Sequence, residues 1–236
     1  MAMSDRRVFG AAVEELSSAH ENGTSLCDPF LSILPITGAS VSTLGAPFGS
    51  ETVCASDEQA ARLDELQFDL GEGPCWDAMN KRRPVLAPDL RGAVQSSWPV
   101  FLQSIGDAPI GALYAFPLAL GSLDIGAVDL FSSQSGALSD AQIIDTVALA
   151  SIVALQVLRR TLSAQTLKPD ADADDGYSRR VVHQATGMVL AQLGLSATDA
   201  LLVIRGYAFS HARSVREVAV DVVARRLDFT SHLNET

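Results

Sequence analysis

One short segment, KPDADADDG at positions 168–176, limits how this chain can fold more than any other feature. It holds four aspartates and no apolar residue larger than alanine. A segment of this composition has no side chains with which to join a hydrophobic core, so it is typical of a linker. We therefore expect two domains, at 1–166 and 178–236, joined by an acidic linker at 167–177.

The two parts of the chain differ in charge. Of the net charge of −11, residues 1–177 carry −13 and residues 178–236 carry +2. The second part contains seven arginines against five acidic residues. An acidic front and a mildly basic back are typical of a sensing part joined to a part that binds a polyanion.

The composition favours a packed protein that stays in water. With 47% hydrophobic residues, the 236-residue chain is expected to be globular and not disordered. The sequence contains no run of about 18 uncharged apolar residues, so we expect no membrane span. Two glutamates interrupt the apolar part of the N-terminal stretch MAMSDRRVFGAAVEELSS, which excludes a signal peptide. We expect a cytoplasmic protein with no membrane partner.

The chain has an odd number of cysteines, and their spacing is not that of metal ligands: Cys27, Cys54 and Cys75. We expect reduced, mostly buried thiols and no metal site. Cys75 follows Gly-Glu-Gly-Pro at a predicted helix start, a position that lowers a thiol pKa, so a redox role is the alternative to a structural one. Because the sequence offers no serine or cysteine nucleophile constellation, we do not expect an enzyme.

Residues 1–166 predict an α+β domain with a mainly antiparallel sheet and flanking helices. Alternation and turn residues predict strands at 38–45, 50–56, 84–90, 110–120 and 124–133. Ser56 with Gln59, and Ser139 with Gln142, predict the starts of two helices. The second of these is apolar on nearly every face, so we expect the stretch 140–160 to pack against a second copy in a homodimer.

Several segments of the first part resemble the GAF family of small-molecule and signal-sensing domains. They are GASVSTL, LGEGPCWDAM, RPVLAPDL and ALYAFPLALGSLDIGAVDLFS, within roughly 22–162. The resemblance implies a GAF-like fold and a pocket for an unknown small molecule, with no other cofactor. Its candidate lining residues are Cys75, Trp76, Trp98, Tyr114, Phe116 and Phe131. Ordinary core packing is the alternative for each of them.

The last part of the chain predicts three short amphipathic helices. Ser196 precedes Asp199 by three residues, and Ser214 precedes Glu217 by three, so each pair can cap a helix. The segments QATGMVL, DALLVIRGYA and SVREVAVDVV resemble, in order, the ANTAR domain, a three-helix RNA-binding module of antitermination regulators of the actinobacterial type. Thr186 departs from the family, which commonly has a lysine there.

The resemblance implies an RNA-binding surface on these helices. Residues without bulk let a backbone or a base approach closely, aromatic and guanidinium planes stack on unpaired bases, and arginines hold phosphates. The free N–H groups at the start of the third helix would add donors. The candidate residues are Ala185, Gly187, Met188, Arg205, Tyr207, Arg213, Ser214 and Arg216. Tight helix packing is the alternative for Gly187, and a core position is the alternative for Tyr207.

Together these features predict a signal-responsive regulator of transcription antitermination. A GAF-like sensor would control an ANTAR-like domain that binds paired hairpins in nascent leader RNA, and RNA polymerase would be affected only indirectly. One alternative is a DNA-binding regulator, because three short helices can present a recognition helix. The other is a cysteine-dependent methionine sulfoxide reductase of the GAF fold, which would need a resolving thiol near Cys75.

Overall fold

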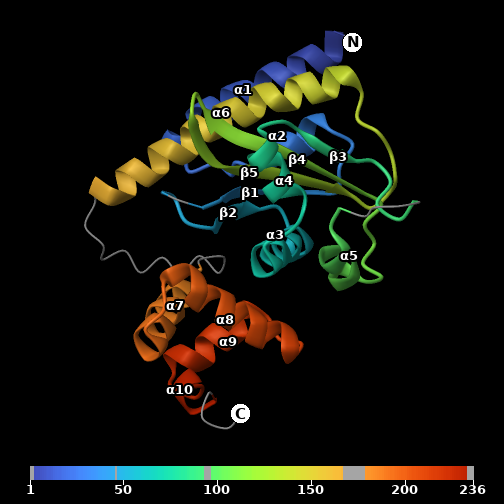
Figure 1. The fold of residues 1–236 in the computed structure, drawn as a ribbon. Coiled ribbons are helices and arrows are strands. Elements are labelled where there is room, and N and C mark those ends of the chain that lie inside the picture. Colours follow the sequence, from blue (N-terminus) through green and yellow to red (C-terminus); the bar gives the residue numbers. More distant parts are fainter. Residues whose placement is uncertain (1–2, 46, 93–96, 167–178, 233–236) are drawn as a thin grey trace. The chain divides into compact units, whose positions relative to one another are not determined.

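The computed structural model describes residues 3–45, 47–92, 97–166 and 179–232, which belong to two compact units (Figure 1). The N-terminal unit comprises residues 1–177 and the C-terminal unit residues 178–236. The predicted linker at 167–177 lies outside the described residues. Each unit has its own core.

The N-terminal unit is built on a five-stranded sheet with the strand order β2-β1-β5-β4-β3. Every neighbouring pair is antiparallel. The strands are β1 (Gly38–Thr43), β2 (Glu51–Ala55), β3 (Val85–Ala87), β4 (Ala112–Leu120) and β5 (Leu123–Ser132). β5 lies in the middle because it pairs with both β1 and β4. At this centre a Cβ on Gly126 would lie 1.8 Å from the Ser42 carbonyl oxygen, so only glycine fits.

Helices cover both faces of this sheet (Figure 1). On one face lie α1 (Met3–Asn22), α2 (Asp28–Ile33) and α6 (Asp140–Thr166), and on the other lie α3 (Glu58–Leu70), α4 (Pro74–Lys81) and α5 (Pro99–Ile105). Alternation along β4 decides which face each side chain joins. Tyr114 and Phe116 pack into the core under α1 and α6, whereas Leu113 packs into the core with α3 and α5.

Local signals place several helix ends where the sequence predicts them. Pro74 begins α4, and the Ser139 hydroxyl accepts a hydrogen bond from the backbone N–H of Gln142 at 3.3 Å. One predicted start is wrong by a residue. Asp57, not Ser56, caps α3, because its carboxylate accepts from the Ala60 N–H at 2.8 Å while the Ser56 hydroxyl accepts from the Ala39 N–H at 2.9 Å.

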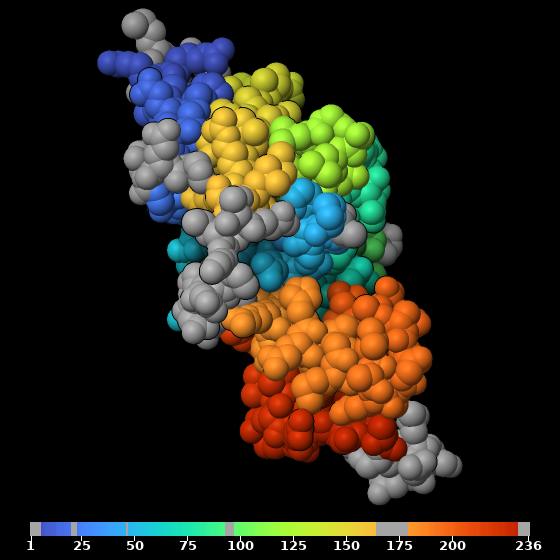
Figure 2. Space-filling view, turned by 90° about the vertical axis from the view of Figure 1, so that its left-hand side faces the viewer, coloured from blue at the N-terminus to red at the C-terminus, as the bar shows by residue number. Residues whose placement is uncertain are grey.

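The long helix α6 lies beside α1 on the surface of the N-terminal unit (Figure 2). Its inner side is fully buried at Leu149, Val153 and Val157, but its outer side exposes Ile144 by 67% and Leu162 by 54%. α6 is long and apolar enough to span a membrane by length and composition, a test that core helices of soluble proteins also pass. Here part of its apolar surface is used to cover the sheet.

The cysteine prediction is wrong for two of the three residues. Cys27, just before α2, and Cys54, on β2, form a disulfide with a Cα–Cα distance of 6.3 Å. They are 27 residues apart in sequence, and only the fold brings them together. Local spacing, the basis of the prediction, could not reveal this pair.

The C-terminal unit consists of α7 (Arg180–Leu193), α8 (Ala197–Ser210), α9 (Val215–Val223) and the short α10 (Phe229–His232). The first three are the predicted helices, and α10 is additional. Its Phe229 is buried among the side chains of the other three, and the Phe229 N–H donates to the Gln192 side chain at 3.3 Å. The core is made of small and β-branched residues that let the helices approach closely: Val182, Ala185, Val189, Ala200, Ile204, Ala208, Val215, Val218, Ala219 and Val222.

Candidate nucleic-acid interface

Gly187 lies in the middle of α7, on its exposed side. No described atom outside its own helix turns lies within 4 Å of the place a Cβ would take, so helix packing does not require glycine there. Glycine in a helix interior costs about 1 kcal/mol relative to alanine. A glycine without a packing role leaves an open strip on which a partner's backbone can lie, with Arg180, His183 and Gln184 exposed along the same side.

The neighbouring candidates on α7 have other roles. Ala185 is fully buried in the core, which contradicts its prediction as an RNA contact: its small side chain serves helix packing. Met188 is half-buried against the same core. The Thr186 hydroxyl donates to the Val182 carbonyl at 2.7 Å, so this side chain folds back onto its own helix.

Tyr207 is held in a stack of three rings at the end of α8. Its ring lies 4.0 Å from that of His211 at an interplanar angle of 17°, and 5.4 Å from that of Phe229, edge to face. One ring face of Tyr207 is therefore covered by His211. Arg205, one turn before the end of α8, is half-buried. His211 was not among the predicted residues, although its i,i+4 spacing from Tyr207 could have indicated the contact.

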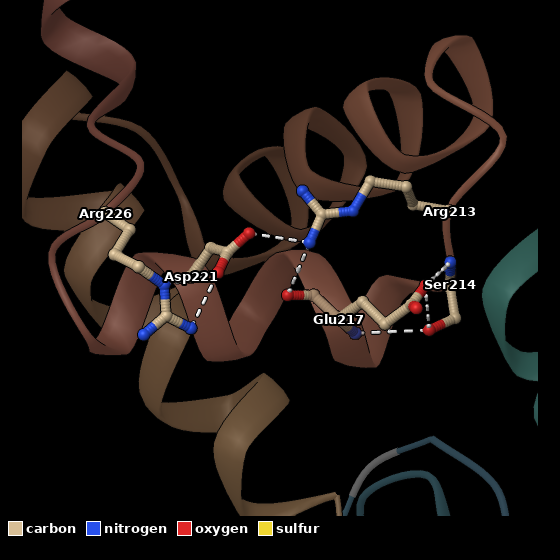
Figure 3. Close-up of polar contacts among 5 residues, drawn as sticks. All are labelled: Arg213, Ser214, Glu217, Asp221 and Arg226. Atoms are coloured by element: carbon tan, nitrogen blue, oxygen red, sulfur yellow. Dashed lines mark hydrogen bonds and ion pairs between the residues drawn. The ribbon is translucent and has the colours of Figure 1, made fainter.

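Arg213 and Arg226 are joined through Asp221 across the length of α9 (Figure 3). The Asp221 carboxylate accepts from Arg213 at 2.6 Å and from Arg226 at 2.7 Å. The hydrogen bond from Arg213, with that from Arg226, holds the pKa of Asp221 below its usual range. The same bond raises the pKa of Arg213. Arg213 is thus partly neutralised, and its first role is to fasten the chain before α9 to the helix.

Ser214 forms the predicted capping box with Glu217 (Figure 3). Its hydroxyl accepts from the Glu217 N–H at 3.1 Å, and the Glu217 carboxylate accepts from the Ser214 N–H at 2.8 Å. Two N–H groups at this helix start are therefore already paired, and the Glu217 carboxylate beside them disfavours a phosphate at this place. Ser214 is a helix cap, and the candidate cation Arg216 is half-buried on α9.

The outer side of α8 is apolar. Leu202 and Phe209, two turns apart, are exposed large side chains, and Gly206 lies between them. As at Gly187, nothing described stands within 4 Å of a Cβ at Gly206. Inside its helices the C-terminal unit thus has two open glycines in different surroundings: Gly187 near cationic and polar side chains, and Gly206 on an apolar surface.

In the N-terminal unit, the six predicted pocket residues do not line one cavity. Tyr114 and Phe116 belong to the core under α1 and α6, Trp98 and Phe131 to the core with α3 and α5, and Cys75 and Trp76 to a small cluster with Phe68. The correction follows from strand alternation, which places the β4 aromatics on the opposite face of the sheet from the others. A hollow of about 350 Å³ does lie between α3 and α5, lined in part by Leu63, Leu66, Ile105 and Arg62.

A buried polar network lies between the sheet and the α3–α4 layer. The Gln67 amide donates to the Asp129 carboxylate at 2.9 Å, and its oxygen accepts from the Cys75 N–H at 2.9 Å. Asp64, also buried, accepts from the Thr52 hydroxyl. Burial raises the pKa of Asp129 well above its usual range, and the charge of Asp64 raises it further.

Comparison with protein families decides the assignment. A model of the GAF domain matches residues 25–155, more than half of the chain. The chain belongs to the GAF domain family. A model of the ANTAR domain matches residues 177–223. The GAF domain is thus followed by an ANTAR domain on α7–α9, which is the architecture of a regulator.

Solved structures agree with this assignment at the level of the fold. The GAF domain of a phosphoenolpyruvate-protein phosphotransferase from Acinetobacter is similar with a TM-score of 0.53 at 11% identity, covering 71% of this chain and 98% of that one. The corresponding domain from Coxiella burnetii has a TM-score of 0.54 at 12% identity, covering 69% and 98%. No curated protein matches the chain. The predicted fold class, a GAF-like α+β domain followed by a helical ANTAR domain, is confirmed.

Within the GAF domain, Cys75 is buried and unsuited to thiol chemistry. Burial raises the pKa of its thiol well above the usual range, and the charges of Asp129 and Asp64 raise it further. The predicted lowering by the helix start is outweighed. Cys27 and Cys54 are bonded to each other, so neither is a thiol that could resolve an oxidised Cys75. This arrangement argues against the alternative of a cysteine-dependent reductase.

Proposed function

We propose that this protein is a regulator of transcription antitermination that binds paired hairpins in nascent RNA through its ANTAR domain. The observation that carries the proposal is the ANTAR match over 177–223, which covers α7–α9. The open strip at Gly187, with Arg180 exposed on the same side of the helix, supports it as a place where an RNA backbone can approach. By binding hairpins of the leader transcript, the protein would favour the antiterminated form, so RNA polymerase is affected only indirectly.

Two copies of the protein would bind the two hairpins. We infer a homodimer formed through the outer side of α6, where Ile144, Val147, Leu155 and Leu162 form an exposed apolar strip. From Ile144 to Leu162 the helix rises by 18 residue steps, about 27 Å at 1.5 Å per residue. A second copy of the same helix is the occupant that matches its length and apolar character. Linking two RNA-binding domains in this way raises avidity without new contacts.

The GAF domain would act as the sensor that controls RNA binding. The hollow between α3 and α5 is our candidate site for its small-molecule signal, in place of the six aromatic and cysteine residues first considered. A signal can change RNA binding only if it binds two states of the protein with different affinity. The cell compartment that contains nascent bacterial transcripts is the cytoplasm, where we place the protein.

A competition experiment tests the proposed function. Full-length protein is titrated into a fluorescent tandem-hairpin RNA at low salt, against unlabelled tandem hairpins, a single hairpin and duplex DNA. We expect the tandem RNA to compete best and the single hairpin less well, because only one domain of the dimer can engage it. Equal or better competition by duplex DNA would instead support a DNA-binding regulator.

A further inference from the structure

We propose that the outer ring face of His211 is a stacking platform for one unpaired base of the bound RNA. The inference rests on the proposed function and adds to it a binding residue and the kind of group it receives. Single-stranded RNA is commonly held by bases that stack on aromatic side chains. The chain offers such a surface, already assembled, at the end of α8.

The three-ring stack gives the platform its rigidity. Phe229 is buried in the core, and Tyr207 packs edge to face on it at 5.4 Å. His211 then lies flat on Tyr207, with ring centroids 4.0 Å apart and planes 17° from parallel. Tyr207 is half-buried and His211 is exposed, so the stack runs from the core to the surface and ends on the imidazole.

Hydrogen bonds fix the imidazole in this position. Its Nδ1 lies 2.8 Å from the Tyr207 carbonyl oxygen, so the ring donates to that carbonyl in the tautomer that carries the hydrogen on Nδ1. The Ser210 hydroxyl lies 2.9 Å from the same nitrogen. The backbone N–H of His211 also donates to the Tyr207 carbonyl, at 3.1 Å. A ring held by its own helix end loses little freedom when a base stacks on it.

The chain around the platform supplies positive charge. Arg213 follows His211 by two residues. Ala212 has a positive φ of 51°, which turns the chain sharply from α8 toward the start of α9. Arg213 is bonded to Asp221, and the N–H groups that it does not use there are the donors that a phosphate beside the stacked base would meet.

A purely structural role for His211 makes a different prediction. As a helix cap, the residue needs only a donor to the Tyr207 carbonyl, which an asparagine amide also provides. As a platform, it needs an aromatic face, which phenylalanine keeps although it loses the Nδ1–H. His211→Asn and His211→Phe therefore separate the two roles, and circular-dichroism melting of both variants shows that the helices still fold.

The test uses the full-length protein and tandem-hairpin RNAs that carry 2-aminopurine at one loop position at a time. We expect wild-type protein to quench the fluorescence at one position. His211→Asn should abolish that quenching and weaken binding about 5- to 150-fold, the range for loss of one stacked base. His211→Phe should retain the quenching and bind within about threefold of wild type, since the stacking surface is kept.

The outcomes distinguish the platform from the function on which it rests. If wild-type protein binds the RNA but His211→Asn binds and quenches equally, the platform is overturned and RNA binding stands. The platform also fails if His211→Phe loses as much affinity as His211→Asn. If wild-type protein binds none of the hairpin RNAs, the proposed function is overturned, and the platform with it.

Discussion

At the scale of single residues, the chain places an ionisable group where its charge is unfavourable. Asp129 is buried in the middle of the sheet, close enough to Asp64 for the two charges to interact. Burial and this neighbour both favour the neutral carboxyl and raise its pKa above that of the unfolded chain. At Asp129 the folded chain therefore binds more protons than the unfolded one between the unfolded pKa, about 4, and the raised folded pKa.

This proton uptake predicts how stability changes with pH. The contribution of Asp129 is full below its unfolded pKa and is lost as the pH rises through the raised folded pKa. Its slope is at most about 1.4 kcal/mol per pH unit. Asp129→Asn should remove this loss, because the amide stays neutral. The free energy of unfolding of the variant should therefore rise relative to that of the wild type as the pH rises. Urea unfolding between pH 4 and 8 measures this difference, with the exposed Asp107→Asn as control. An equal loss of stability in Asp129→Asn at every pH would contradict the assignment.

At the scale of elements, the disulfide joins the start of α2 to the edge strand β2. Cross-linking two residues 27 apart limits the unfolded chain. Loop-closure entropy gives a stabilisation of about 3.5 kcal/mol for a loop of this length. We expect Cys27→Ser, Cys54→Ser and reduction of the wild-type protein to lower the unfolding free energy of the GAF domain by similar amounts. If reduction leaves the melting temperature unchanged, the disulfide does not form in solution.

The α9 helix is held at both ends by Asp221. Replacing it with asparagine breaks the ion pairs with Arg213 and Arg226, so we expect a lower melting temperature of the ANTAR domain at neutral pH. The Asp221 contribution is present above its unfolded pKa and is lost as pH falls through the lowered folded pKa, so the difference should vanish in strong acid. Asp221→Asn also removes the negative charge beside Arg213, which makes the net charge of the domain more positive by one, and it should strengthen RNA binding. Weaker binding by a folded Asp221→Asn variant would contradict this account.

The sequence predicted features that depend on neighbouring residues better than contacts between segments far apart in the chain. Local signals worked: Pro74 begins α4, Ser214 caps α9, and the strands at 112–120 and 123–132 lie within two residues of their predicted ends. Features that join distant segments were missed, because no local pattern records them. The Cys27–Cys54 bond and the packing of Phe229 under Tyr207 are of this kind. Strand alternation could have separated Tyr114 from Phe131, but the pocket was predicted from residue type alone.

At the scale of the whole molecule, the proposed function requires two copies. The apolar strip on α6 predicts that Leu155→Glu places a charge in the dimer contact and yields monomers, which light scattering after size-exclusion chromatography would detect. Ser151→Glu, on the exposed side one turn earlier, should weaken the dimer as well. Arg83→Glu, an exposed change after α4, is the control and should leave it intact. A Leu155→Glu variant that remains dimeric would place the contact elsewhere.

The central claim is that α7 presents an open strip to RNA, and two glycines allow a matched test of it. Gly187 and Gly206 each lie in a helix interior with open space for a Cβ, so Gly187→Glu and Gly206→Glu add the same charge at two comparable positions. Affinity of the full-length variants for fluorescent tandem-hairpin RNA is the measurement. We predict that Gly187→Glu weakens binding roughly tenfold or more, an effect of about 1.4 kcal/mol, and that Gly206→Glu changes it much less. Equal affinity of the Gly187→Glu variant and the wild-type protein would contradict the account.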